Sequence, residues 1–208
     1  MKRTLVLLFA LCLVGWSGVA AAAPQGQVVV AQGVDPTTLD PHWHEETPAY
    51  NVLLNIYDTL LFRDKNLNII PWLATSWKLV NPTTWEFKLR QGVKFHNGEE
   101  FDAEAVKYSL DRLRDPELKN RQAANFRLIA SVDVVDKLTV RITTSKPFPT
   151  LENQLALRGA AMAPKHFKGK DKVFADRNPV GTGPYKFVRW AKDEQIVLEA
   201  NPQWWGGA

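Results

Sequence analysis

Apolar side chains follow a helical spacing in some stretches of the chain and a strict alternation in others, and these patterns predict its elements. Thr47 and Pro48 suit a helix start, because threonine can cap the first turn and proline lacks an N–H that would be unpaired there. The apolar residues that then recur at helical spacing are Val52, Leu53, Ile56, Tyr57, Leu60 and Leu61. A second helix is predicted to begin after Asp102 and to end at Asp115-Pro116. Its expected solvent face comprises Glu104, Lys107, Asp111 and Arg112.

Strands are predicted between and after these helices. Trp85, Phe87 and Leu89 alternate with charged residues, as in a half-buried antiparallel strand. Further predictions are a buried strand at residues 28–30, a tight turn at 96–99, a hairpin at 132–143, a short helix at 151–157, and strands at 185–190 and 195–200. This mixture of helices and antiparallel strands predicts an α/β fold of the mixed α+β type.

Residues 1–22 have the pattern of a secretory signal peptide. Lys2 and Arg3 form a short basic start, residues 5–19 are uncharged and almost wholly apolar, and alanines follow. Cleavage is expected after Ala22 or a neighbouring residue, since Pro24 is a poor residue immediately after a cut. An uncleaved anchor helix is the alternative, because residues 4–23 are just long enough to span a bilayer. We therefore expect export to the periplasm.

Composition and charge exclude several classes of protein. With 208 residues, 45% hydrophobic and 23% charged, the chain is neither a disordered tail nor a polytopic membrane protein. Two units of the formal net charge of +4 come from Lys2 and Arg3, and the balance of the rest gives no reason to expect nucleic acid as a partner. The single cysteine, Cys12, lies within the predicted signal, so the exported chain is expected to have neither a disulfide nor a cysteine metal ligand.

The sequence contains no recognisable catalytic motif. Ser76 and Ser109 have no histidine at a meaningful spacing, and neither a Gly-x-Ser-x-Gly elbow nor a His-Glu-x-x-His helix occurs. Gly181-Thr182-Gly183 lacks the Lys-Ser or Lys-Thr that completes a phosphate-binding loop. We therefore predict a binding protein without a cofactor, not an enzyme.

Several motifs in a fixed order resemble one family. They are Thr38-Leu39-Asp40-Pro41, the predicted helix Asn51 to Leu61, Ile70-Pro71-Trp72-Leu73-Ala74, Trp85-Glu86-Phe87-Lys88-Leu89-Arg90, Val93-Lys94-Phe95-His96-Asn97-Gly98, Ala105-Val106-Lys107-Tyr108-Ser109-Leu110, Asn178 to Tyr185 and Asn201-Pro202-Gln203-Trp204-Trp205. The sequence resembles the extracellular solute-binding proteins of family 5, which are peptide, nickel and glutathione receptors of bacterial ABC importers. The resemblance runs from about Val28 to the last residue.

The resemblance implies a two-lobed, periplasmic-binding-protein-like architecture with a ligand enclosed between the lobes. This chain would contain the first lobe in two segments, residues 23–58 and 179–208, and a subdomain inserted between them at 59–178. The second lobe would be missing. Trp204 and Trp205 point the same way, because they lie near the last residue and no later residues follow on which they could pack. A monomer is expected.

The same resemblance places candidate ligand-binding residues just before the first predicted helix. Trp43, His44, Glu45, Glu46 and Thr47 lie where relatives line the cleft, and Glu45 and Thr47 fall where peptide binders contact the ligand backbone. Glu45 could pair with a ligand amine. The alternative is an exposed polar loop.

Three further features have a functional and a plain interpretation. Arg121 lies where relatives approach the ligand and could bind a carboxylate with two nitrogens, or it is an ordinary surface arginine. His42 and His44 alternate as two metal ligands would on an extended chain, but four histidines in all leave too few ligands for a closed site, so no metal is predicted. Gly181 and Gly183 suit a hinge or tight crossing between subdomains.

These features and the resemblance imply the substrate-binding component of an ABC importer. It would capture di- or oligopeptides outside the cytoplasmic membrane and deliver them to the ABC permease. The same architecture binding nickel, a metallophore, glutathione or a sugar is one alternative, and a secreted interaction module is an alternative of another class. Because one lobe supplies only half of the ligand contacts, this chain alone is expected to bind weakly.

Overall fold

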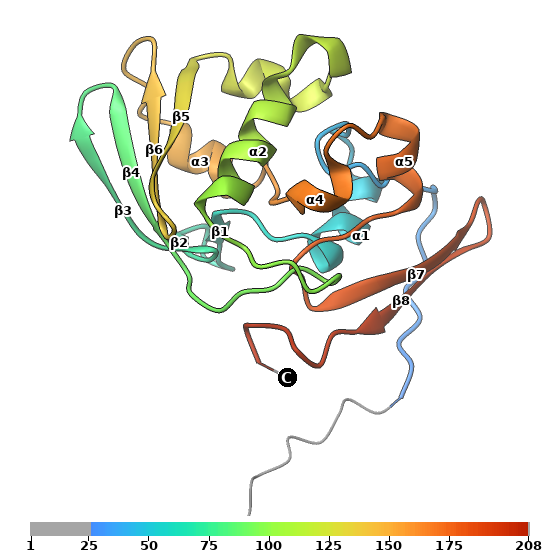
Figure 1. Ribbon diagram of the computed structural model, residues 1–208. Helices are drawn as coiled ribbons and strands as arrows, with labels where there is room; N and C mark the ends of the chain where they lie inside the picture. The colour runs from blue at the N-terminus through green and yellow to red at the C-terminus, as the bar shows by residue number, and fades with distance from the viewer. Residues whose placement is uncertain (1–25, 208) are drawn as a thin grey trace, which may run out of the picture.

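The computed structural model describes residues 26–207 (Figure 1). The predicted signal peptide at residues 1–22 lies outside this range, so its cleavage remains a prediction. Across the described residues, no helix combines the length and the apolar character needed to cross a membrane.

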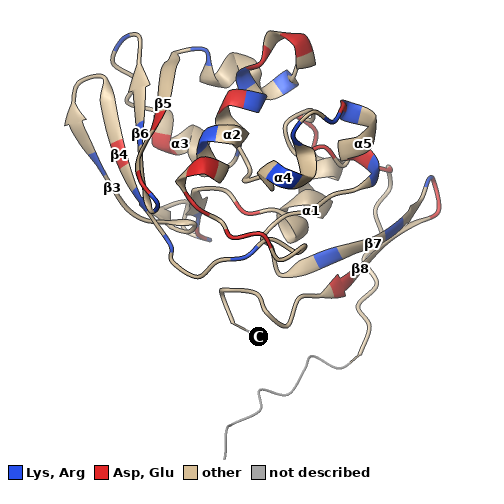
Figure 2. Cartoon of the chain, in the orientation of Figure 1, with Lys and Arg blue, Asp and Glu red and all other residues tan. Residues whose placement is uncertain are grey.

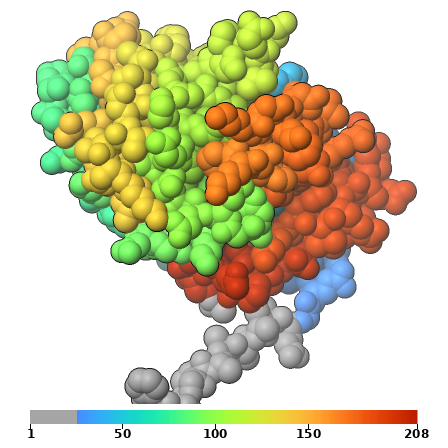
Figure 3. All heavy atoms as spheres, viewed as in Figure 1, coloured from blue at the N-terminus to red at the C-terminus, as the bar shows by residue number. Residues whose placement is uncertain are grey.

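Short helices alternate with antiparallel strands, which confirms the predicted mixed α/β class (Figure 1). In chain order the elements are α1 (Thr47–Ile56), β1 (Leu61–Arg63), β2 (Ile69–Pro71), β3 (Ala74–Asn81), β4 (Thr84–Leu89), α2 (Ala103–Arg114), the 3₁₀ helices η1 (Pro116–Leu118) and η2 (Arg121–Phe126), β5 (Ile129–Asp136), β6 (Thr139–Thr144), α3 (Leu151–Leu155), α4 (Pro164–Phe167), α5 (Lys172–Arg177), β7 (Tyr185–Ala191) and β8 (Gln195–Ala200). Helix α4 packs beside α2, and the two form one surface in the space-filling view (Figure 3).

A four-stranded antiparallel sheet in the order β3-β4-β6-β5 forms one side of the molecule. Trp85, Phe87 and Leu89 of β4 are buried, as their alternation predicted. The register with β6 places Trp85 opposite Ile142 and Phe87 opposite Val140. Because cross-strand neighbours of this size contact each other directly, they give the sheet a continuous apolar face.

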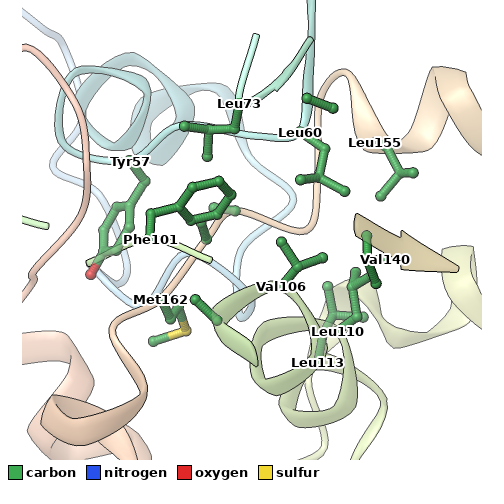
Figure 4. Close-up of a cluster of buried hydrophobic side chains, with 14 of the residues drawn as sticks. Tyr57, Leu60, Leu73, Phe101, Val106, Leu110, Leu113, Val140, Leu155 and Met162 are labelled. Atoms are coloured by element: carbon green, nitrogen blue, oxygen red, sulfur yellow. The ribbon is translucent and has the colours of Figure 1, made fainter. Parts of the chain in front are cut away.

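Helix α2 packs against this sheet and completes the core. It begins where predicted, because the Asp102 carboxylate accepts a hydrogen bond from the Ala105 backbone N–H at 3.0 Å. The residues that α2 turns toward the core in Figure 4 are Val106, Leu110 and Leu113. Acidic and basic bands alternate along its solvent face (Figure 2), where Lys107 and Asp111 pair at 2.8 Å. Arg112 was expected on that face, and this prediction was wrong, since its side chain is buried.

Two crossings of the chain lie side by side where α1 ends and β7 begins. The Gly183 N–H donates to the Ile56 carbonyl at 2.9 Å, and the Thr182 hydroxyl donates to Asp58 at 2.8 Å. A Cβ atom added to Gly183 would lie 2.6 Å from the Asn55 carbonyl oxygen, which is closer than real side chains approach. Glycine is therefore required for this contact between the two segments.

The two tryptophans near the end of the chain pack inside the described structure. The Trp205 indole donates to Asp58 at 2.9 Å, and its ring meets Trp72 edge-on with centroids 4.9 Å apart. The Arg90 guanidinium lies 4.4 Å from the Trp205 ring centroid. Trp204 and Trp205 thus pack on residues that precede them in the chain, a possibility that the sequence analysis did not consider.

Three local predictions were also wrong. Val28, Val29 and Val30 are 81–86% exposed and form no strand, because no described strand pairs with them. Helix α1 ends at Ile56 and does not continue to Leu61; residues 57–61 are buried in non-helical backbone, so their apolar spacing imitated a helix. Its N-cap is Glu46, one residue before the predicted Thr47, and no side chain caps it.

Candidate functional site

A loop of residues 40–46, which leads into α1, carries the predicted ligand-binding residues and is held by a buried ion pair. Asp40 accepts hydrogen bonds from two nitrogens of Arg112 on α2, at 2.6 and 3.1 Å. The two side chains are only 1% and 5% exposed. Asp40 also accepts from the His42 backbone N–H at 3.0 Å, which closes a turn at the start of the loop. The ion pair therefore connects the loop directly to the helix that fills the core.

His42 takes part in the same buried network. Its Nε2 lies 3.0 Å from the Ala160 carbonyl oxygen and its Nδ1 lies 3.2 Å from Arg112. Burial and the nearby positive charge of Arg112 lower the pKa of His42 to about 4, so the ring is neutral at pH 7. Burial would raise the pKa of Asp40, but hydrogen bonds and the charge of Arg112 hold it below its usual range. At neutral pH the network is a charged pair with a neutral imidazole beside it.

Gln122 on η2 holds the other side of the loop. Its side-chain amide donates to the Pro41 carbonyl at 2.8 Å and to the His44 carbonyl at 3.3 Å. Its oxygen accepts from the Gly159 backbone N–H at 3.3 Å. Because Gln122 is almost fully buried, these bonds fix both the loop and the segment before Ala160 in one arrangement.

Glu45 faces an arginine on a distant segment. Arg158 donates to the two carboxylate oxygens at 3.0 Å from Nε and 2.8 Å from Nη2. Asn125 donates to the same carboxylate at 3.0 Å. The side chains of Glu45 and Arg158 are 31% and 20% exposed, so solvent reaches the pair. Arg158 was missed by sequence reasoning because nothing in the chain marks a contact across 113 residues.

Two neutral polar atoms of residues close to Glu45 in the chain have no hydrogen-bond partner among residues 26–207. His44 and Tyr50 meet edge-on with ring centroids 4.2 Å apart. These atoms are His44 Nδ1 and the Tyr50 hydroxyl oxygen, and both are buried within the described part of the chain. Burial lowers the pKa of His44 and raises the pKa of Tyr50 to about 12, so neither group is charged at neutral pH.

The side chains of Glu46 and Thr47 lie outside the ion pair of Glu45 and Arg158. Glu46 accepts hydrogen bonds from the hydroxyl and backbone N–H of Thr37. Burial would raise the pKa of Glu46, but these bonds hold it below its usual range. Thr47 is exposed at the first position of α1. The Glu45 backbone N–H also donates to the Glu46 carboxylate at 3.4 Å, but the carboxylates of Glu45 and Glu46 bind different side chains.

Trp43 lies between two cations. The Arg121 guanidinium stands 4.6 Å and the Lys172 ammonium 3.7 Å from the Trp43 ring centroid. Such contacts hold both cations through the negative face of the indole. Of the predicted candidates, Arg121 is exposed and stacks on Trp43, whereas Glu45 forms its ion pair with Arg158.

The described residues offer no closed metal site. Between residues 26 and 207, no cluster of three or more metal-ligating side chains is positioned to hold an ion. Both ring nitrogens of His42 have partners inside the core, so His42 and His44 do not form a joint pair of ligands.

Two hollows in the structure lie apart from Glu45 and Arg158. One, of about 110 Å³, is lined by residues that include Asp58, Trp72 and Trp204. The other is an open groove of about 750 Å³ between α2 and the segment around Lys168. Neither hollow is lined by Glu45 or Arg158, whose side chains are 31% and 20% exposed.

The glycines of the predicted crossing lie in the contact between the two chain segments described above. Cβ atoms at Gly181 and Gly183 would both collide with backbone at the end of α1. His96 is bound to the same place, with its backbone N–H donating to the Gly181 carbonyl at 2.9 Å. These contacts agree with a tight crossing, while a hinge role stays a prediction.

Comparison with known proteins gives consistent matches over most of the chain. Residues 68–208 match the family described as "Bacterial extracellular solute-binding proteins, family 5 Middle". The glutathione-binding protein GsiB of Pectobacterium atrosepticum is 36% identical over 181 residues, which cover 85% of this chain and 35% of GsiB. This chain therefore spans about a third of the length of that relative.

Solved structures agree with this match. NikZ of Campylobacter jejuni, in complex with Ni(L-His), shares 30% identity with a TM-score of 0.73, over 83% of this chain and 35% of NikZ. The oligopeptide-binding protein AppA of Bacillus subtilis, in complex with a nonapeptide, shares 26% identity with a TM-score of 0.76, over 84% of this chain and 36% of AppA. The similarity thus extends to the arrangement of the elements.

Proposed function

Because the chain belongs to the bacterial extracellular solute-binding proteins of family 5, we propose that it is part of the substrate-binding component of an ABC importer. The component would capture di- or oligopeptides outside the cytoplasmic membrane, in the periplasm, and deliver them to the ABC permease. The observation that carries this proposal is the family match over residues 68–208, supported by the similarity to AppA. We further propose that the protein is a monomer and that its role is binding, not catalysis.

The charges at Glu45 and Arg158 support a zwitterionic ligand. A short peptide carries an ammonium group at one end and a carboxylate at the other. The described surface offers a carboxylate and a guanidinium side by side, partly exposed, and Arg121 of η2 stacks on Trp43 of the same loop as Glu45. Guanidinium and carboxylate are the groups that bind peptide ends most strongly, because their hydrogen bonds are charge-assisted.

Glutathione is the specific alternative, because GsiB relatives are 35–37% identical to this chain. Glutathione is itself a short peptide with ammonium and carboxylate groups, so the same charges suit it. A nickel chelate is a second alternative, supported by the similarity to NikZ.

We propose that residues 23–58 and 179–208 are segments of a first lobe and that residues 59–178 are a subdomain inserted between them. The bonds from Gly183 to Ile56 and from Thr182 to Asp58 support this division, since they bring both ends of the insertion together. The partner lobe would come from sequence outside this chain. A ligand between two lobes gains contacts from both, so the 208-residue chain alone should bind it weakly.

Calorimetry on the protein encoded by the complete reading frame tests the proposal. Titration with dipeptides, longer peptides, glutathione and a Ni–histidine chelate should show saturable binding of a peptide. Binding of the chelate alone would replace the peptide proposal with the metal alternative. Binding of none of them, with a correctly folded protein, would refute the importer proposal. Tight peptide binding by the 208-residue chain itself would refute the two-lobe argument.

A further inference from the structure

Glu45 occupies Arg158 in the way that a ligand carboxylate would. Its two oxygens accept from Nε and Nη2 of Arg158 at 3.0 and 2.8 Å, which is the two-pronged arrangement that guanidinium prefers for carboxylates. The remaining nitrogen, Nη1, donates to the Gln154 side-chain oxygen at 3.2 Å. All three nitrogens of Arg158 therefore have partners within the chain, and a ligand carboxylate can bind to the Nε–Nη2 edge only by displacing Glu45.

The pair is weak enough and open enough to be displaced. Its side chains are 31% and 20% exposed, whereas those of Asp40 and Arg112 are 1% and 5% exposed. Ion pairs in contact with solvent contribute little to stability, because water screens them and competes for both partners. The Glu45–Arg158 pair is therefore exchangeable, while the Asp40–Arg112 pair is structural.

The surroundings of the pair also have unused hydrogen-bonding capacity. His44 Nδ1 and the Tyr50 hydroxyl are buried and have no partner among the residues that the structure describes, and the charges of Glu45 and Arg158 act on the pKa values of both groups. An unpaired buried polar atom costs free energy, so an arrangement that gives these atoms partners is favoured. A bound ligand or a reoriented Glu45 could supply them.

We propose that Glu45 is an internal competitor for Arg158, which it holds in the unliganded protein and releases when a ligand carboxylate takes the same two nitrogens. The inference rests on the proposed function and narrows it to ligands that carry a carboxylate. No covalent bond changes; one ion pair replaces another. The displaced Glu45 stays nearby, where it attracts a ligand ammonium and repels a ligand that has only negative charges. Glu45 therefore makes the site selective for zwitterions.

The first test measures whether Glu45 masks Arg158 in the 208-residue chain. Arg158 is labelled with phenylglyoxal and its modification rate is followed by peptide mass spectrometry. Glu45→Gln should accelerate labelling of Arg158 about fivefold, the largest effect expected for a solvent-exposed pair, and Glu45→Ala should do the same. The matched control is Glu86→Gln, which breaks the Glu86–Arg141 pair of 2.8 Å and should accelerate labelling of Arg141 alone. An unchanged Arg158 rate in both Glu45 variants overturns the inference.

The second test measures selectivity in the protein encoded by the complete reading frame. Calorimetry compares a free-amine dipeptide with its N-acetylated form. Glu45→Gln should strengthen binding of the acetylated peptide. The variant no longer has a carboxylate that competes for Arg158, and the acetylated peptide has no ammonium group that Glu45 could attract. Equal weakening of both peptides would mean that Glu45 only supports the site, and the inference would be wrong. If no peptide binds while Arg158 labelling responds to Glu45, the proposed function fails and the masking stands.

Discussion

Replacing Arg112 by methionine tests whether the candidate loop depends on a buried ion pair. The substitution leaves Asp40 at 1% side-chain exposure without the two guanidinium hydrogen bonds of 2.6 and 3.1 Å. Removing one member of a buried pair costs about 3–5 kcal/mol, because the remaining charge is neither solvated nor compensated. Methionine fills a similar volume, so little of the loss should come from a cavity.

The pH dependence separates this cause from poorer packing. In the natural chain the pKa of Asp40 is held below its ordinary value of 3.8, so its stabilisation is present above that pH and is lost as the pH falls through the lowered pKa. Without Arg112, burial raises the pKa of Asp40, and its charge then destabilises the folded state as the pH rises. The loss caused by Arg112→Met should therefore be largest at neutral pH and should shrink toward acid.

Urea unfolding followed by circular dichroism gives the free energies. The cycle Arg112→Met, Asp40→Asn and the double variant should show a coupling energy of about 1–3 kcal/mol, with the double variant more stable than the sum of the single losses predicts. A loss below about 1 kcal/mol for Arg112→Met, or a loss that does not change between neutral pH and the ordinary pKa of Asp40, would refute the reasoning.

Three further outcomes are expected. Gly181→Ala should destabilise the chain by about 1–3 kcal/mol in the same urea assay, because its Cβ collides with backbone at the end of α1, whereas Gly33→Ala, with open space around its Cβ, should change stability by less than about 0.5 kcal/mol. Asp58→Ala should cost about 1–3 kcal/mol and shift tryptophan emission, since two indole N–H groups lose their acceptor; unchanged emission would contradict the assigned bonds. The His42 imidazole should show no titration by NMR between about pH 5 and 8, because its pKa is about 4, and a midpoint within that range would mean that the ring is not buried as described.

Local patterns predicted the elements whose signals are complete within a few residues. The alternation in β4, the Asp102 cap of α2 and the strands β7 and β8 needed no knowledge of distant residues. Residues 28–30 show the limit of this approach, because an apolar run becomes a strand only where another strand pairs with it.

The candidate site was predictable only in part. The motif resemblance named Glu45 and Trp43 as candidates, but not the residues that hold them. Arg112 was assigned to the solvent face because arginine is rarely buried, yet Asp40, 72 residues away, compensates its charge. The role of Arg158 was likewise not predicted, because its partner Glu45 is 113 residues away in the chain. Partners of charged groups are set by tertiary packing, and a single sequence does not record which distant charges meet.

The adjacency of Ile56 and Gly183 has a consequence for engineering. The two flanks lie close enough to be joined by a brief linker, but the intervening segment also supplies Arg112, Gln122 and Arg158 to the loop of residues 40–46. An exchange of this segment for that of a relative should therefore include the loop, so that Asp40 and Arg112 are transferred together. A chimaera built this way would reveal which of the two parts determines what is recognised.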